Sequence, residues 1–125
     1  MKYAIRYYSR NLFISSADEI ILRFIDKHDE LAEYIKTYYS YQRIILDVSG
    51  YDEAETGKEL IEYLPMIAEA ALEHEQFAVM LSYKQINFAK ELDENGIAYF
   101  FNMRVDTIDK LNSLLSLNLE IIYNT

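Results

Sequence analysis

Four short apolar runs stand out along the chain, at residues 43–48, 77–81, 97–101 and 119–123. Each has the length of a β-strand and is rich in the β-branched or aromatic side chains that strands favour. Three of the runs are apolar at nearly every position, which is typical of strands covered on both faces. We therefore predict that residues 43–48, 77–81 and 98–101 form the central strands of a sheet.

Two runs near the amino terminus alternate between apolar and polar positions. Alternation with a period of two indicates strands with one solvent-exposed face, which is typical of the edge of a sheet. We expect two such edge strands, with their apolar positions at Tyr3, Ile5 and Tyr7 and at Ile20, Leu22 and Phe24.

The segments between the later runs carry the 3.6-residue period of amphipathic helices. We predict four helices, over residues 29–41, 55–73, 85–95 and 106–118. Pro65 lies inside the second, so that helix must kink or divide there. A row of glutamates from Glu55 to Glu73 follows the polar side of the same helix. Gly96 suits the left-handed position that ends the third helix, and Ile97 can then fold back to make an apolar contact with that helix.

The order of these elements predicts an α/β fold. After the first strand, strands and helices alternate along the chain, which indicates β-α-β units with right-handed crossovers. We expect a mostly parallel sheet of about six strands with four helices, in one domain over residues 1–125. The sheet could be an open flavodoxin-like or doubly wound sheet, or half of a (β/α)₈ barrel, because a whole barrel needs roughly 250 residues.

Composition narrows the choice of partners and compartment. Lys and Arg total 12 against 21 Asp and Glu, a net charge of −9 that repels nucleic acid and anionic lipid. No apolar run approaches the roughly 20 residues that span a bilayer. The chain has no cysteine, so disulfides and thiolate chemistry are excluded. We expect a cytoplasmic protein with no nucleic-acid or membrane partner.

Candidate chemistry lies where the strands end, because ligands bind at the carboxyl ends of parallel strands. Asp47, Lys84, Arg104 and Asn124 follow or end predicted strands and could share one crevice. A carboxylate beside two cations would suit an anionic or polyhydroxylated ligand. The glycines are isolated, so the chain has no phosphate-binding loop, and it has no metal-ligand spacing or nucleophile–base pair. We therefore expect no cofactor.

Tyrosine is the other unusual feature, with 12 in the chain. Tyr34, Tyr38, Tyr39 and Tyr41 crowd near one helix end, and tyrosine is a strong interface residue. The residues before 51 carry seven acids and seven bases, so this half of the chain is neutral. Two copies could meet there without opposing their acidic segments. A non-catalytic interaction or assembly domain, partnered by itself as a homodimer or by another protein, is therefore the expected function. A small-ligand binding protein or enzyme, with an anion-accepting site at the strand ends, is the alternative.

Overall fold

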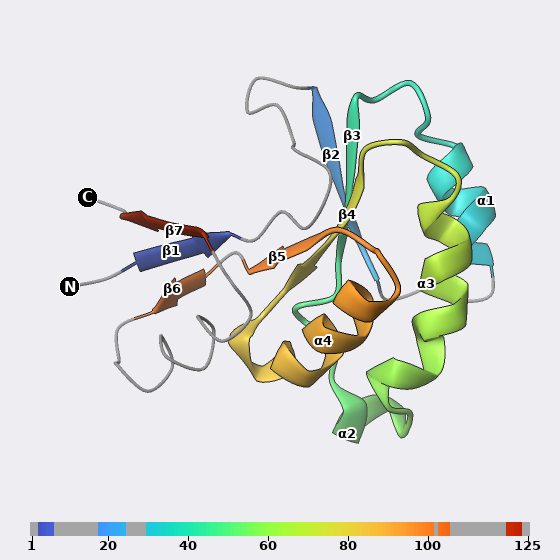
Figure 1. The fold of residues 1–125 in the computed structure, drawn as a ribbon. Helices are drawn as coiled ribbons and strands as arrows, with labels where there is room; N and C mark the ends of the chain where they lie inside the picture. The colour runs from blue at the N-terminus through green and yellow to red at the C-terminus, as the bar shows by residue number, and fades with distance from the viewer. Residues whose placement is uncertain (1–2, 7–17, 25–29, 102, 106–119, 124–125) are drawn as a thin grey trace.

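A parallel four-stranded sheet forms the centre of the computed structural model, which describes residues 3–6, 18–24, 30–101, 103–105 and 120–123 (Figure 1). The strands are β2 (Glu19–Arg23), β3 (Arg43–Asp47), β4 (Phe77–Leu81) and β5 (Tyr99–Phe101). They lie in the order β2-β3-β4-β5, and each neighbouring pair is parallel. The predicted α/β class with a parallel sheet is confirmed.

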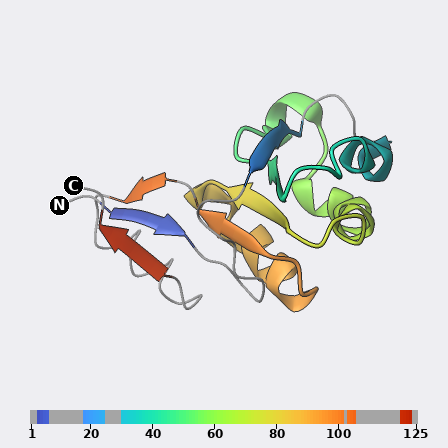
Figure 2. The ribbon, with the colours of Figure 1, turned by 90° about the horizontal axis from the view of Figure 1, so that it is seen from above.

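Four helices connect these strands: α1 (Leu31–Lys36), α2 (Glu53–Thr56), α3 (Leu64–Ala71) and α4 (Ile86–Glu94). Of these, α1, α3 and α4 cover the same face of the sheet (Figure 2). The strand order explains this one-sided layer. When each new strand is added on the same side of the last one, right-handed crossovers place every helix on one face.

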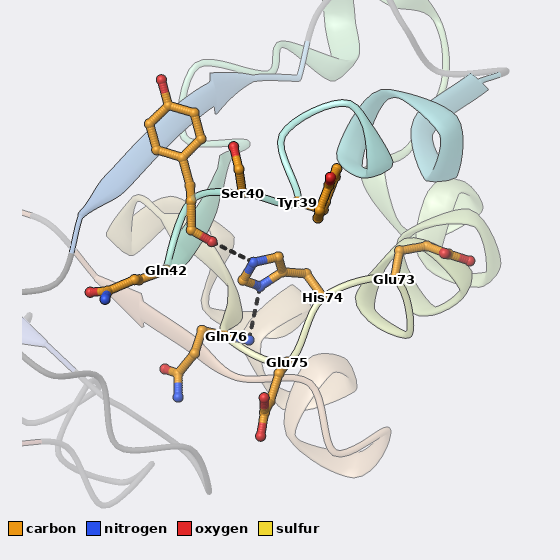
Figure 3. A pocket seen from close by; sticks show the side chains of 8 residues that line it. Tyr39, Ser40, Gln42, Glu73, His74, Glu75 and Gln76 are labelled. Atoms are coloured by element: carbon orange, nitrogen blue, oxygen red, sulfur yellow. Dashed lines mark hydrogen bonds between the residues drawn. The ribbon is translucent and has the colours of Figure 1, made fainter.

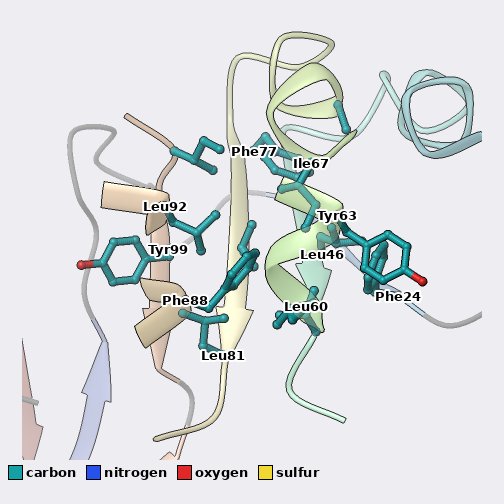
Figure 4. Close-up of a cluster of buried hydrophobic side chains, with 14 of the residues drawn as sticks. Phe24, Leu46, Leu60, Tyr63, Ile67, Phe77, Leu81, Phe88, Leu92 and Tyr99 are labelled. Atoms are coloured by element: carbon teal, nitrogen blue, oxygen red, sulfur yellow. The ribbon is translucent and has the colours of Figure 1, made fainter. Parts of the chain in front are cut away.

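Most of the core lies between this face and the helices (Figure 4). Fully or almost fully buried side chains of α1, α3 and α4 meet those of the strands, among them Leu31, Ile35, Ile67, Leu92, Leu46 and Leu81. The opposite face holds a second buried cluster, made of Ile45, Ala78, Met80, Ala98 and Phe100. Burial on both faces is the reason for the continuous hydrophobicity of β3, β4 and β5.

A second sheet joins the two ends of the chain. It contains β1 (Tyr3–Arg6) between β6 (Met103–Val105) and β7 (Glu120–Tyr123), and β1 is antiparallel to both neighbours. β6 follows β5 almost directly, and β1 also contacts β5. Residues from the two ends of the sequence therefore lie side by side next to β5 (Figure 1).

Three predictions about the sheets are wrong. The parallel sheet has four strands and not six, because β7 pairs with β1 and does not continue the β-α-β series. β1 is the central strand of its sheet and not an edge. β5 ends the parallel sheet, although none of its residues is more than 3% exposed. Hydrophobicity reports burial, and it does not identify the strands to which a given strand is hydrogen-bonded. The predicted edge position of β2 is confirmed.

The segment predicted as one helix over residues 55–73 is divided twice. Gly57, at φ 74°, ends α2, and a 3₁₀ helix η2 (Leu60–Tyr63) then leads into α3. Pro65 lies in the first turn of α3, where a missing N–H breaks no helical hydrogen bond, so the predicted division there is confirmed. The break at Gly57 means that the glutamates do not form one continuous helix face.

The predicted left-handed glycine at the end of α4 is confirmed. Gly96 takes φ 70°, and the Ile97 amide folds back to donate to the Leu92 carbonyl at 2.9 Å. The helix predicted over residues 106–118 lies outside the described residues.

Candidate functional site

The carboxyl ends of β3 and β4 open onto a hollow of about 430 Å³. The loop after β3 supplies Ser49 and Asp52 to its wall, α2 supplies Glu53, and the turn after β4 supplies Ser82 and Lys84. This is the end of a parallel sheet at which ligands bind in α/β proteins. The hollow is therefore the first candidate site.

Gln85 holds the two strand ends together beneath this hollow. Its side-chain amide donates to the Val48 carbonyl, just after β3, at 2.6 Å. Its side-chain oxygen accepts from the Ser82 amide, just after β4, at 3.0 Å. The second bond is half of a capping box, in which Ser82 and Gln85 satisfy each other's backbone at the start of a 3₁₀ helix. One side chain thus fixes the spacing of the site's two walls.

Asp47 and Lys84 both belong to this end of the sheet. The Asp47 carboxylate accepts hydrogen bonds from the Ser49 amide at 2.9 Å and from the Ser49 hydroxyl at 2.5 Å. Ser49 lines the hollow, so Asp47 orients a wall residue. The exposed Lys84 lines the hollow directly.

The structure does not test the other two predicted site residues. Arg104 lies inside β6, where its backbone pairs with Ala4 of the antiparallel sheet, and the structure describes nothing of its side chain. Asn124 lies outside the described residues. Of the predicted site residues, the described part of the hollow therefore contains Lys84 itself and Ser49, the hydrogen-bond partner of Asp47.

Acidic side chains dominate the surroundings of Lys84. A second hollow of about 330 Å³ adjoins the first, sharing Glu53 and Lys84 and adding Glu59 and Glu91. Lys84 is the only cation among the described residues lining either hollow. This excess of carboxylates produces a negative potential, which opposes the binding of an anion.

The opposite end of the sheet carries a larger pocket of about 570 Å³, in which His74 lies (Figure 3). Its Nδ1 accepts from the Gln76 amide at 3.0 Å, so Nε2 carries the proton and donates to the Tyr41 carbonyl at 2.7 Å. Both ring nitrogens are thus used to tie the loop before β3 to the loop before β4. Such a histidine is structural and has no free nitrogen for catalysis.

The predicted interface tyrosines surround the end of α1 next to this pocket. The rings of Tyr34 and Tyr38 pack edge to face, with their centres 5.5 Å apart. The centre of the Tyr41 ring lies 6.2 Å from that of Tyr38. Burial is the larger cause of a rise in the pKa of Tyr34 above its ordinary value of 10, and the electrostatic and hydrogen-bonding interaction with Tyr38 raises it further. Tyr39 is different, because it is 75% exposed. Three of the four tyrosines therefore form a packed cluster, and Tyr39 alone presents most of its side chain to solvent.

The outer edge of β2 is a third candidate surface. Asp18 and Phe24 direct their backbone hydrogen bonds to β3, and the groups alternate along a strand. The amides and carbonyls of Glu19, Ile21 and Arg23 therefore point away from β3, and no other described strand pairs with them. Ile21 is 49% exposed in the middle of this edge.

Sequence reasoning missed two of these features. The spacing from Ser82 to Gln85 before a helical segment is the signature of a capping box, and it could have revealed Gln85. No comparable signal marks His74, because its partners are backbone groups of two separate loops.

Comparisons with known proteins found no matching family model, no matching curated protein and no matching solved structure. Among the described residues, no group of three His, Asp or Glu side chains could hold a metal ion. No helix in the part of the chain that the structure describes is long and apolar enough to cross a membrane.

Proposed function

We propose that this chain is a non-catalytic assembly domain of the cytoplasm that binds a second copy of itself. The observation that carries the proposal is the outer edge of β2, with which no other described strand pairs and which has the exposed apolar side chain of Ile21 at its centre. A strand edge with unpaired amides and carbonyls is a ready template for pairing with another chain, and proteins that stay monomeric usually block it. The charged residues Glu19 and Arg23 flank Ile21 with opposite signs.

The form of the sheet supports this proposal. The sequential strand order, with the described helices α1, α3 and α4 on one face, favours the half (β/α)₈ barrel over a doubly wound sheet, which has helices on both faces. A barrel closes its sheet on itself, whereas half a barrel leaves its first strand, here β2, at an open edge. A second copy could cover this edge.

Charge favours contact through the amino-terminal half of the chain. Residues 51–97 carry 11 acids and three lysines, whereas the residues before 51 are neutral overall. β2 and α1 both belong to the neutral half. Contact there keeps the acidic loops of the two copies apart and limits their repulsion.

The mass in solution tests the proposal. Sedimentation equilibrium of the full chain at physiological salt should give twice 14.8 kDa as the concentration rises. A mass of 14.8 kDa at every concentration would contradict self-assembly. A complex with a different protein, formed by a monomeric chain, would also contradict it.

Ligand binding at the carboxyl ends of β3 and β4 is the second candidate function, favoured by the hollow beside Lys84. Inorganic phosphate can serve as a probe in a thermal-shift titration. If the site accepts anions, phosphate should raise the melting temperature, and Lys84→Ala should remove the effect. Lys90→Ala, at an exposed position of α4, is the matched control. Arg104→Ala tests whether Arg104 contributes to the same site.

A further inference from the structure

We propose that two copies pair through β2 in antiparallel register, with Ile21 opposite Ile21 and Glu19 opposite Arg23 of the other copy. This inference rests on the proposed function, and it specifies the contact surface and the partner's register. The sequence of β2, Glu-Ile-Ile-Leu-Arg, is the starting point. When two copies of this strand run antiparallel, an acid lies opposite a base at each end, and Ile21 lies opposite Ile21 in the middle.

The direction of the backbone groups fits this register. The amides and carbonyls of Glu19, Ile21 and Arg23 all point away from β3. In an antiparallel pair, hydrogen-bonded residues recur at every second position. Pairing residue 21 with 21 and residue 19 with 23 therefore uses all three outward-facing residues of each copy.

Other registers lose this match. A shift by one residue would oppose the outward-facing groups of one copy to the inward-facing groups of the other. A shift by two residues keeps the hydrogen bonds, but it places Ile21 opposite either Glu19 or Arg23. It also removes the alignment of acid with base. Charge complementarity thus selects one register among those that the backbone allows.

The side chains of Glu19, Ile21 and Arg23 lie on the same face, since successive residues of a strand alternate between faces. This is the face opposite the helices, because the alternate residues Leu22 and Phe24 belong to the core cluster under the helix layer. A two-fold axis perpendicular to the sheet preserves both faces. The result is one continuous sheet of eight strands with the helices of both copies on one side, an isologous contact that closes at two subunits.

Glu19 already has a partner within its own chain. Its carboxylate accepts a hydrogen bond at 2.9 Å from the guanidinium of Arg43, whose side chain is only 5% exposed. The Glu19 side chain remains 39% exposed, so its carboxylate can also accept from Arg23 of a second copy. The nearly buried Arg43 holds Glu19 in place at the edge, which lowers the entropy lost when the copies meet.

A charge substitution tests the pairing. Arg23→Glu would place two acids opposite each other at both ends of the strand pair. Attractive pairs are replaced by repulsive ones at both ends, which should weaken dimerisation by about tenfold, or about 1.4 kcal/mol. Lys90→Glu makes the same change in net charge on the exposed side of α4 and should leave dimerisation almost unchanged. Arg23→Lys keeps the positive charge and should retain most of the dimerisation affinity.

A covalent trap tests the register directly. The chain has no cysteine, so Ile21→Cys introduces one thiol per copy. In the proposed register the two α-carbons lie about 5.5 Å apart, within the range of a disulfide. Mild oxidation should therefore link Ile21→Cys rapidly into a dimer. Leu72→Cys, at an 86% exposed position at the end of α3, is the matched control and should link slowly.

The outcomes separate the two proposals. If the chain dimerises but Ile21→Cys links no faster than Leu72→Cys, and Arg23→Glu changes nothing, the β2 pairing is wrong while self-assembly stands. If Tyr39→Glu abolishes that dimer, the contact lies at the tyrosines. A chain that stays monomeric at every concentration overturns both proposals.

Discussion

Removing the side chain of Gln85 should separate the two strand ends that it joins. Gln85→Ala deletes the hydrogen bonds to the Val48 carbonyl and from the Ser82 amide. Two such bonds contribute about 2 kcal/mol to the free energy of unfolding. The Val48 carbonyl keeps the Tyr51 amide as a donor at 3.0 Å, whereas the half-buried Ser82 amide loses its side-chain acceptor. We therefore expect a total cost of about 2–3 kcal/mol.

Urea denaturation followed by circular dichroism measures this cost. Gln85→Glu distinguishes hydrogen bonding from simple loss of packing, because a carboxylate can accept from Ser82 but cannot donate to Val48. Its second carboxylate oxygen would replace the amide nitrogen that lies 2.6 Å from the Val48 carbonyl, and repulsion between the two oxygens should make Gln85→Glu at least as destabilising as Gln85→Ala. Asn95→Ala, which deletes one exposed side-chain bond to Glu91, should cost about 1 kcal/mol or less. A Gln85→Ala variant within about 0.5 kcal/mol of the unsubstituted chain would refute the role given to Gln85.

Three further predictions concern other positions. His74→Ala should lower the free energy of unfolding by about 1–3 kcal/mol in urea, since two backbone partners are lost, while exposed Glu75→Ala should change it little. Gly96→Ala should cost about 1–2 kcal/mol in the same assay through its positive φ, whereas Gly50→Ala, with open space and no positive φ, should not. The pKa of Tyr34 is higher in the folded chain than its ordinary value of 10. The neutral Tyr34 side chain therefore contributes fully to the free energy of unfolding below about pH 10, and this contribution is lost as the pH rises through the folded pKa. Tyr34→Phe should therefore lose less stability than the unsubstituted chain between about pH 8 and about pH 11.

Much of the fold follows from patterns that the sequence displays locally. Continuous hydrophobicity located β3 and β4, a period of two located β2 at an edge, and Gly96 marked the end of α4. These signals succeed because burial and backbone conformation act on each segment separately.

Strand partners could not be predicted in the same way. β1 carries the alternation of an edge strand, yet it lies between β6 and β7, which come about a hundred residues later. Alternation shows that one face of a strand is polar, but it does not show whether the two edges are hydrogen-bonded. The same limit explains β5, whose burial was predicted and whose terminal position was not.

The candidate surfaces were predictable only in part. The sequence predicted Lys84 at the end of a strand. Two of the acids around it, Glu53 of α2 and Glu59 just before η2, come from an earlier part of the chain, so a local pattern does not reveal them. The opposite charges of Glu19 and Arg23 are visible in the sequence. Their meaning depends on which backbone groups of β2 point away from β3, and this requires the hydrogen-bonding pattern of the sheet.

Amide hydrogen exchange along β2 tests self-assembly through this edge most directly. In a monomer, the amides of Glu19, Ile21 and Arg23 face away from β3 and should exchange rapidly. In the proposed dimer all three are hydrogen-bonded to the second copy. NMR-detected exchange should therefore show these three amides becoming protected as the protein concentration rises, and becoming unprotected again in Arg23→Glu. Rapid exchange at all three positions in a sample that sedimentation shows to be dimeric would contradict pairing through β2.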